Sequence, residues 1–194
     1  MKIETARFVQ AAHSQDGFLS DGRPEIALVG RSNVGKSSLL NRLVGRNKLA
    51  RISSTPGRTR AINYFLINDR FYLADLPGYG YAKVSKTERA AWGRLMDAYF
   101  QQAGPGCACI QLVDAKVGAT PLDVQAHEYL DSLGRVGEVV ATKIDKVGRS
   151  RRAAALRDIR QQLQLQDGEI IPFSARTGEG IKKLWRAIDN RLAG

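Results

Sequence analysis

Segments of β-strand type alternate with segments of helical periodicity along this chain of 194 residues, and this alternation constrains the fold more than any other feature. The apolar, strand-like segments are 25–30, 61–68, 70–78, 107–114, 137–145 and 168–175. The helical segments, with apolar residues at i, i+3 or i+4, are 36–45, 86–102, 121–134, 149–164 and 181–194. Such a pattern predicts a three-layer α/β fold, in which a mainly parallel sheet carries helices on both faces.

The strand-like segments AINYFLIN and RFYLADLPG depart from this alternation. Only Asn68 and Asp69 separate their apolar parts, which is too short for a crossover, so the two strands must form an antiparallel hairpin. We therefore expect a mixed sheet with one antiparallel strand, at an edge of the sheet. Residues 1–24 are expected to be a short lead-in, and residues 25–194 to form one domain around a single core.

The turn between the first strand and the first helix, GRSNVGKS, fits the phosphate-binding pattern G-x-x-x-x-G-K-[ST]. Gly30 and Gly35 let backbone N–H groups point at a phosphate, and the dipole of the following helix directs its positive end at the same anion. Lys36 can reach the terminal phosphates, and the Ser37 hydroxyl can ligate Mg²⁺. The alternative is a Gly-rich turn that binds nothing.

The sequence TKID (142–145) ends a strand at the carboxyl edge, where open α/β sheets bind ligands. A carboxylate at Asp145 can accept hydrogen bonds from N1–H and the exocyclic amino group of guanine. Adenine offers no matching pair and would leave a buried carboxylate unpaired. The stem of Lys143 can lie against the base plane. The alternative is a surface Lys-x-Asp without a ligand.

Two shorter signals complete the set. Asp75 opens DLPG at the end of a strand beside the phosphate loop, where its carboxylate can hold a water molecule of the Mg²⁺ ion. The N–H of Gly78 can meet the γ-phosphate. Ser174 and Ala175 follow the last strand, and their turn offers backbone N–H groups to the guanine oxygen. Together these signals predict a guanine nucleotide site with Mg²⁺ as its cofactor.

Five stretches carry a family resemblance: GRSNVGKSSLLN, STPGRTRAINYF, DLPGYGYAKV, TKIDK and FSA. With them the sequence resembles small GTPases, and more narrowly the EngB family of bacterial ribosome-assembly GTPases, from about Glu25 to the end. The resemblance implies a six-stranded mixed sheet and a single EngB-type GTP-binding domain. It also implies hydrolysis of GTP to GDP and phosphate, a switch role in assembly of the large ribosomal subunit, and a need for the protein in normal cell division and septation.

The same resemblance assigns the site residue by residue. The residues expected to bind the nucleotide are Gly30, Arg31, Ser32, Asn33, Val34, Gly35, Lys36, Ser37, Ser38, Gly57, Arg58, Thr59, Arg60, Ala61, Asp75, Leu76, Pro77, Gly78, Thr142, Lys143, Ile144, Asp145, Phe173, Ser174 and Ala175. Thr59 is expected to be the switch threonine, which ligates Mg²⁺ beside Ser37 only when the γ-phosphate is present. The residues expected to act in hydrolysis are Lys36, Thr59, Gly78 and Asn33.

The side chain of Asn33 has two possible roles. In GTPases similar to this one, an asparagine at that place helps hold a K⁺ ion beside the phosphates, where the cation stands in for an arginine finger. Otherwise Asn33 is an amide that caps the loop. In GTPases of the Ras type a glutamine after the D-x-x-G glycine orients the attacking water, whereas a phenol, Tyr79, stands here. We infer slow intrinsic hydrolysis, stimulated by a partner or by potassium.

Three positions differ from the residues that are usual in GTPase motifs. Arg60 stands where EngB relatives usually carry glutamine, and Ile144 where alanine is common. Thr142 replaces the asparagine of the general GTPase motif, as it does in EngB relatives. Because a hydroxyl makes fewer loop-tying hydrogen bonds than an amide, we expect modest rather than extreme nucleotide affinity.

The chain carries 30 Lys and Arg against 19 Asp and Glu, a net charge of +11. Such a charge favours a polyanionic partner, either nucleic acid or a membrane surface, and the resemblance makes that partner ribosomal RNA of the large subunit. The alternative is that the charge serves solubility alone. No apolar run reaches membrane-spanning length and the first residues lack a signal-peptide core, so we expect a cytoplasmic protein without stable membrane association. Nothing in the sequence requires more than a monomer.

Two other functional classes compete with this interpretation. One is a metabolic P-loop kinase, which would need an acceptor pocket and a lid, and the other is an RNA-binding module that has lost turnover. The presence of Lys36, Ser37, Thr59 and Asp75 argues against such a loss. The two cysteines of the run CACIQLV are expected to be core residues.

Overall fold

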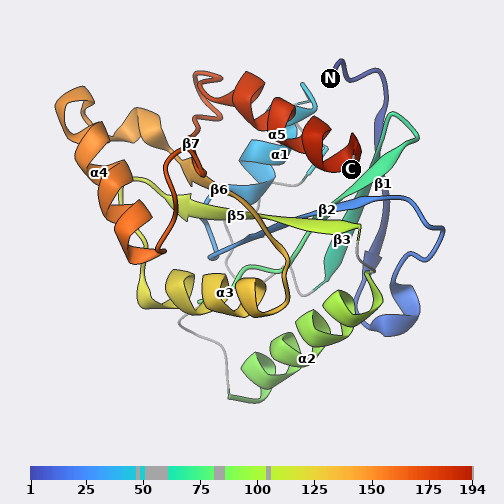
Figure 1. Ribbon diagram of the computed structural model, residues 1–194. Coiled ribbons are helices and arrows are strands. Elements are labelled where there is room, and N and C mark those ends of the chain that lie inside the picture. Colours follow the sequence, from blue (N-terminus) through green and yellow to red (C-terminus); the bar gives the residue numbers. More distant parts are fainter. Residues whose placement is uncertain (47–48, 51–60, 81–85, 104–105, 194) are drawn as a thin grey trace.

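The computed structural model describes residues 1–46, 49–50, 61–80, 86–103 and 106–193 (Figure 1). In this part of the chain the strands lie in one sheet in the order β1-β3-β4-β2-β5-β6-β7. The strands are β1 (Ala6–Ala12), β2 (Glu25–Gly30), β3 (Ile62–Ile67), β4 (Phe71–Asp75), β5 (Cys107–Asp114), β6 (Val136–Thr142) and β7 (Ile170–Pro172). The helices are η1 (Gln15–Gly17), α1 (Lys36–Leu43), α2 (Lys86–Gln102), α3 (Pro121–Ser132), η2 (Ile144–Lys146), α4 (Arg149–Gln162) and α5 (Ile181–Ala193).

The sheet therefore has seven strands in the described residues, rather than the six expected. The additional strand, β1, lies in the segment expected to be a lead-in and pairs antiparallel with β3. β3 is antiparallel to β4, while all the other neighbouring strands pair in parallel. β3 is thus the single reversed strand, as expected, but the prediction that it lies at an edge is wrong because β1 covers its outer side.

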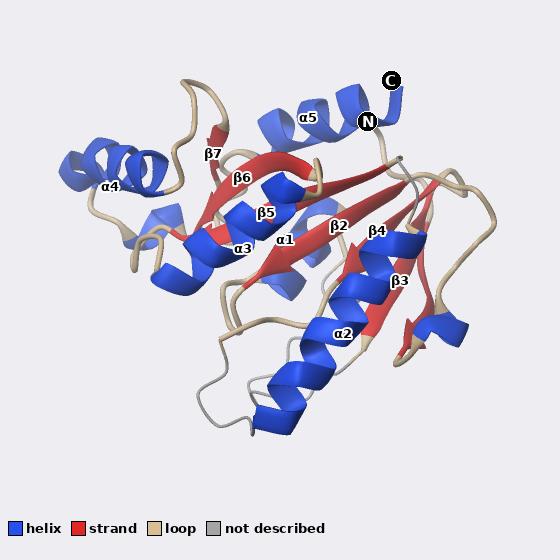
Figure 2. Cartoon of the chain, turned by 60° about the horizontal axis from the view of Figure 1, so that its bottom comes forward, coloured by secondary structure: helices blue, strands red, loops and turns tan. Residues whose placement is uncertain are grey.

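Helices cover both faces of the sheet, which confirms the three-layer fold (Figures 1 and 2). Successive side chains of a strand point to opposite faces. Accordingly Ile110 and Leu112 of β5 pack in a core with residues of α1 and α5. Cys107 and Cys109 of the same strand pack with α2 and α3, and Val113 packs with α4. Both cysteines are buried and free, which confirms their prediction as core residues.

The turn from β3 to β4 sets where the next functional segment lies. Asn68 and Asp69 have φ of 48° and 52°, and the N–H of Arg70 donates to the carbonyl of Ile67 at 2.9 Å. This is a hairpin turn of type I′, whose twist matches that of the strands. β4 then runs parallel to β2 and brings Asp75 opposite Leu28, at the carboxyl edge of the sheet.

The carboxyl ends of four neighbouring strands meet at that edge. They carry Asp75 of β4, Gly30 of β2, Asp114 of β5 and Thr142 of β6. Asp114 lies opposite Thr142 in the sheet register, and Gly30 lies opposite Leu112. The fold thus brings Asp114 together with residues of three separate sequence motifs, in the place where open α/β sheets bind ligands. No helix of the described residues is both long and apolar enough to cross a membrane.

Asn41 of α1 fastens the chain that leaves this helix. Its side-chain amide, which is buried, donates to the carbonyl of Ala50 and accepts from the N–H of Ala50, both at 2.8 Å. We predict that Asn41→Ala lowers the free energy of unfolding by about 1–3 kcal/mol, since both groups of Ala50 lose their partner. Urea denaturation measures this, with Asn190→Ala, an exposed asparagine of α5, as the control. Equal effects of the two substitutions would contradict the assignment.

Candidate nucleotide-binding site

The phosphate loop leaves β2 at Gly30 and enters α1 at Lys36. Gly30 is closely surrounded, because a Cβ there would lie 2.9 Å from the Leu112 carbonyl oxygen. Asn33 and Gly35 have φ of 63° and 113°, the left-handed backbone that asparagine and glycine tolerate best. Gly35 is the N-cap of α1 and offers no side-chain cap, so the first N–H groups of the helix remain free for an anion.

Lys36 and Asp75 are the charged groups at the base of this loop. The Lys36 amine donates to the Gly30 carbonyl at 3.3 Å. The Oδ1 atom of Asp75 is buried and has no hydrogen-bond partner among the described residues. Burial raises the pKa of Asp75 and lowers that of Lys36, while the attraction between the two opposes both shifts. A Cβ on Gly78 would lie 3.0 Å from the Lys36 Nζ, so DLPG lies against the loop, as expected.

Tyr79 points away from the phosphate loop. Its carbonyl accepts the N–H of Ser32 at 2.9 Å, and its hydroxyl donates to Oδ1 of the buried Asp123 at 2.9 Å. The ring is 8% exposed, and it packs edge-on against Trp92 with the centroids 6.3 Å apart. The phenol is therefore held against α3, where it cannot present water to a phosphate. This agrees with the sequence argument that Tyr79 does not replace the glutamine of the Ras type.

The end of β6 fastens the phosphate loop from the other side. The Thr142 hydroxyl lies 2.7 Å from the Val34 carbonyl oxygen and 3.1 Å from a carbonyl oxygen of β5, and these two acceptors share its one proton. The Lys143 amine donates to the Asn33 carbonyl at 2.7 Å and pairs with Asp114 at 2.7 Å. Threonine thus ties the loop as expected, through one hydroxyl where an amide would offer more hydrogen bonds.

Asp145 lies at the other end of the site. Its Oδ1 accepts the Ser174 hydroxyl at 2.6 Å, and its Oδ2 accepts Nε of Arg176 at 3.0 Å. The Ser174 oxygen in turn accepts the N–H of Thr177 at 3.1 Å. The Ser174 hydrogen bond, and after it Arg176, hold the pKa of Asp145 below its ordinary value. The carboxylate is therefore charged and oriented at neutral pH.

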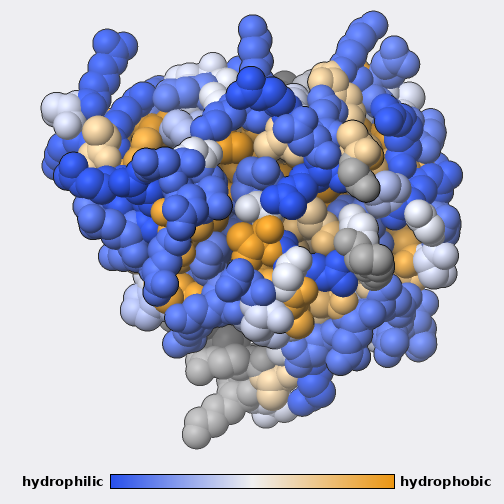
Figure 3. Space-filling view, in the orientation of Figure 1, coloured by the Kyte–Doolittle hydropathy of each residue, from blue (hydrophilic) through white to orange (hydrophobic). Residues whose placement is uncertain are grey.

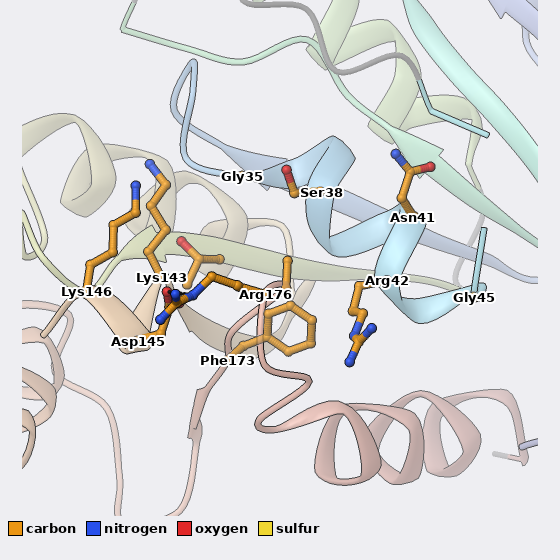
Figure 4. A pocket seen from close by; sticks show the side chains of 12 residues that line it. Gly35, Ser38, Asn41, Arg42, Gly45, Lys143, Asp145, Lys146, Phe173 and Arg176 are labelled. Atoms are coloured by element: carbon orange, nitrogen blue, oxygen red, sulfur yellow. Dashed lines mark hydrogen bonds and ion pairs between the residues drawn. The ribbon is translucent and has the colours of Figure 1, made fainter. Parts of the chain in front are cut away.

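A pocket of about 480 Å³ runs between α1 and the two loops that carry Asp145 and Arg176 (Figure 4). Its lining residues are Gly35, Ser38, Asn41, Arg42, Gly45, Thr142, Lys143, Asp145, Lys146, Phe173, Ala175 and Arg176. In Figure 4, Lys143, Asp145 and Arg176 gather at one end, and Ser38 and Asn41 come from α1. Positively charged and polar groups thus line the space that extends from the phosphate loop.

Other residues expected at the site have different places. Val34, Leu76 and Ile144 are buried in the core, so only their backbone is left to meet a ligand. Ala61 is buried just before β3. Ser37 lies half-buried in the first turn of α1, Arg31 forms a parallel bridge with Tyr79, and Pro77 accepts a hydrogen bond from Trp92. Gly57, Arg58, Thr59 and Arg60 lie outside the described residues.

Several residues of this region were not expected from the sequence. Asp114, which pairs with Lys143, ends a strand at the carboxyl edge, and that position could have identified it. Arg176 directly follows the Ser174-Ala175 turn, but no local pattern indicates its partner. Asp123 has a local signal, since it forms a capping box with Thr120 at the start of α3, but nothing local indicates its contact with Tyr79, which spans 44 positions.

Comparison with known proteins establishes the family. Residues 25–143 match the family model described as 50S ribosome-binding GTPase. The chain is 50% identical to the probable GTP-binding protein EngB of Pelotomaculum thermopropionicum, over 97% of this chain and 96% of that protein. It is 47% identical to the probable GTP-binding protein EngB of Chlorobaculum tepidum, over 97% of this chain and 98% of that protein.

The chain belongs to the EngB family of P-loop GTPases. A crystal structure of a probable GTP-binding protein EngB superposes on this EngB-family chain with a TM-score of 0.72 at 25% identity, covering 87% of this chain and 98% of the other. Era in complex with MgGDPNP and nucleotides 1506–1542 of 16S ribosomal RNA gives a TM-score of 0.66 at 27% identity, covering 87% of this chain and 56% of Era. Family membership makes the protein a GTPase and disfavours a metabolic kinase.

Thr142 offers a direct test of the tie between β6 and the phosphate loop. We predict that Thr142→Val, which keeps the shape of the side chain, weakens GDP binding about tenfold, because a buried carbonyl loses its hydrogen bond and the loop its anchor. Isothermal titration calorimetry measures the GDP affinity. The control is Thr5→Val, which changes an exposed threonine near the N-terminus. Unchanged GDP affinity in Thr142→Val would show that the loop holds its shape without this hydroxyl.

Proposed function

We propose that this GTPase is a Mg²⁺-dependent switch in assembly of the large ribosomal subunit, and that it is needed for normal cell division and septation. One observation carries the proposal. A phosphate loop with free N–H groups lies beside Asp75, whose buried Oδ1 has no hydrogen-bond partner in the described residues, and the pocket that begins at Gly35 of this loop ends at the oriented carboxylate of Asp145. The match to a ribosome-binding GTPase model supports the ribosomal role.

The residues present fit a Mg²⁺ ion. The free Oδ1 of Asp75 is the acceptor that a water molecule of the ion would need. Ser37, in the first turn of α1, and Thr59 would ligate the ion itself. When bound, Mg²⁺ neutralises negative charge on the phosphates. Lys36 adds a second positive charge at the same place, and its contact with the Gly30 carbonyl gives way to a phosphate oxygen.

In the proposed complex the base lies in the pocket. Asp145 reads N1–H and the amino group of guanine, and Ser174 holds the carboxylate in place. The stem of Lys143 lies against the base, since its amine is fixed between Asn33 and Asp114. The remaining contacts are the residues named above for the nucleotide, among which Thr59 and its neighbours sense the γ-phosphate.

The proposed hydrolysis needs a group that promotes attack by water, since Tyr79 cannot orient the water molecule. The side-chain amide of Asn33 is exposed and makes no hydrogen bond within the described residues, which weakens the alternative that it caps the loop. Its place next to the phosphates supports a K⁺ ion held there. Otherwise the partner itself supplies the stimulation.

Potassium dependence has a direct test. We predict that GTP hydrolysis is faster in KCl than in NaCl at equal ionic strength, by about tenfold or more. Asn33→Gly should abolish the difference, because glycine accepts the φ of 63° and removes only the amide. Phosphate release measures both. Equal hydrolysis rates of the wild type in the two salts would refute stimulation by potassium, and the partner would then be the source of stimulation.

The proposed partner is the large ribosomal subunit and its RNA. A net charge of +11 favours an RNA surface, and hydrophilic side chains cover most of the face seen in Figure 3. Arginines are well suited to this, because they bind phosphates and stack on exposed bases. We propose that the protein binds the large subunit in the cytoplasm, as a monomer without stable membrane association.

Ribosome binding should depend on the nucleotide. We predict that the chain co-sediments with purified large subunits more strongly with a GTP analogue than with GDP, because the γ-phosphate orders the switch that carries Thr59. Small subunits are the control, and the salt dependence of binding reports the charged contacts. Equal binding with the two nucleotides would refute the coupling.

A further inference from the structure

Both carboxylate oxygens of Asp145 are engaged in this structure, by two groups of different character. Ser174 donates its hydroxyl at 2.6 Å from a position with 0% exposure. Arg176 donates Nε at 3.0 Å, and its side chain is 77% exposed, against 10% for Asp145. Ser174 is therefore a fixed part of the interior, whereas Arg176 reaches the carboxylate from solvent.

This arrangement conflicts with reading a base. Guanine presents two donors, N1–H and the exocyclic amino group, and a carboxylate that reads both must offer both of its oxygens. Arg176 lines the same pocket and lies beside Asp145 in Figure 4. Each carboxylate oxygen has two acceptor positions, so the buried Ser174 hydroxyl leaves one position of Oδ1 free. The Arg176 Nε–H, in contrast, donates to Oδ2 from within the pocket, where the base would have to lie.

The side chain of Arg176 can move although its loop cannot. The backbone N–H of Ser174 donates to the Glu179 carbonyl at 3.1 Å, and the N–H of Gly178 donates to the Ser174 carbonyl at 2.8 Å. A Cβ on Gly180 would lie 2.1 Å from the Pro172 carbonyl oxygen, so the backbone is tightly packed there. The backbone thus holds Arg176 beside the pocket, and rotation of its exposed guanidinium into solvent frees Oδ2.

We propose that Arg176 is a side-chain latch, which occupies Asp145 when no nucleotide is bound and gives way to guanine; this rests on the proposed role of Asp145 in reading the base. The latch neutralises the carboxylate of the nucleotide-free protein. It thereby lowers nucleotide affinity and eases the exchange of GDP. Because exposed ion pairs are weak, the latch changes affinity by a small factor and is readily displaced.

The test compares three variants with the wild type. Arg176→Met removes the latch, Arg176→Lys keeps a charged donor at the same place, and Lys146→Met removes a different cation of the same pocket. Calorimetry with Mg²⁺ measures the GDP dissociation constant, and thermal unfolding is followed with and without saturating GDP. We expect Arg176→Met to tighten GDP binding by about two- to fivefold, Arg176→Lys to stay close to the wild type, and Lys146→Met to tighten nothing.

The thermal data separate a latch from a merely structural ion pair. Loss of the latch should lower the Tm of the nucleotide-free protein and leave the Tm with saturating GDP unchanged, so that GDP shifts the Tm further than in the wild type. Weaker GDP binding by Arg176→Met, or equal tightening by Lys146→Met, would overturn the latch while wild-type GDP binding still stands. Absence of GDP binding by the wild type would instead overturn the proposed function, and the latch with it.

Discussion

The hydrogen bond from the Thr142 hydroxyl to the Val34 carbonyl joins the two halves of the site, and the rest of its geometry depends on this contact. The two residues are 108 positions apart, and their strands β6 and β2 are separated in the sheet by β5. The Lys143 amine adds a second tie to Asn33. These two contacts fix the distance between the phosphate loop and the segment after β6 that carries Asp145. Less conformational entropy is therefore lost when a nucleotide binds.

Within the described part of the chain, polar groups without partners lie on and beside the loop that these ties hold. Oδ1 of Asp75 and Nε of Arg31 are buried without a hydrogen bond in the described residues, and α1 begins at Gly35 without a side-chain cap. A buried polar atom that is left without a hydrogen-bond partner costs a folded protein about 1–3 kcal/mol. In the proposed complex, the nucleotide and Mg²⁺ would supply partners for the N–H groups at the start of α1 and for Asp75, and these contacts would add to the binding free energy. At Asp145 the structure supplies a partner, because Arg176 donates to Oδ2 of the carboxylate, and in the proposed complex guanine would replace it.

Much of the fold and the site could be predicted, because the relevant signals are local. The spacing of Gly30, Gly35 and Lys36 encodes a loop within eight residues, and the two-residue step at Asn68 fixes a hairpin. The edge strand β1 could not be predicted in this way. It buries only its terminal alanines, Ala6 and Ala12, and a bulge between Phe8 and Gln10 interrupts its alternation.

The contacts that escaped prediction join distant parts of the chain. Tyr79 could be recognised as unfit to orient water from its chemistry alone, but its partner Asp123 comes from a helix that only the folded sheet brings near. Arg176 shows the same limit, since a surface arginine has no periodic signal and its partner is set by the turn around Ser174.

Calorimetry of GDP, XDP and ATP binding with Mg²⁺, on the wild type and on Asp145→Asn, tests directly whether Asp145 reads guanine. We predict that the wild type binds GDP and not ATP. In the variant, the affinity for GDP should fall about a hundredfold and the affinity for XDP should rise. The reason is that the amide of the variant would donate to the xanthine oxygen, where the Asp145 carboxylate accepts from the guanine amino group. Comparable binding of ATP by the wild type, or unchanged GDP binding by the variant, would contradict the assignment of Asp145 as the residue that reads guanine.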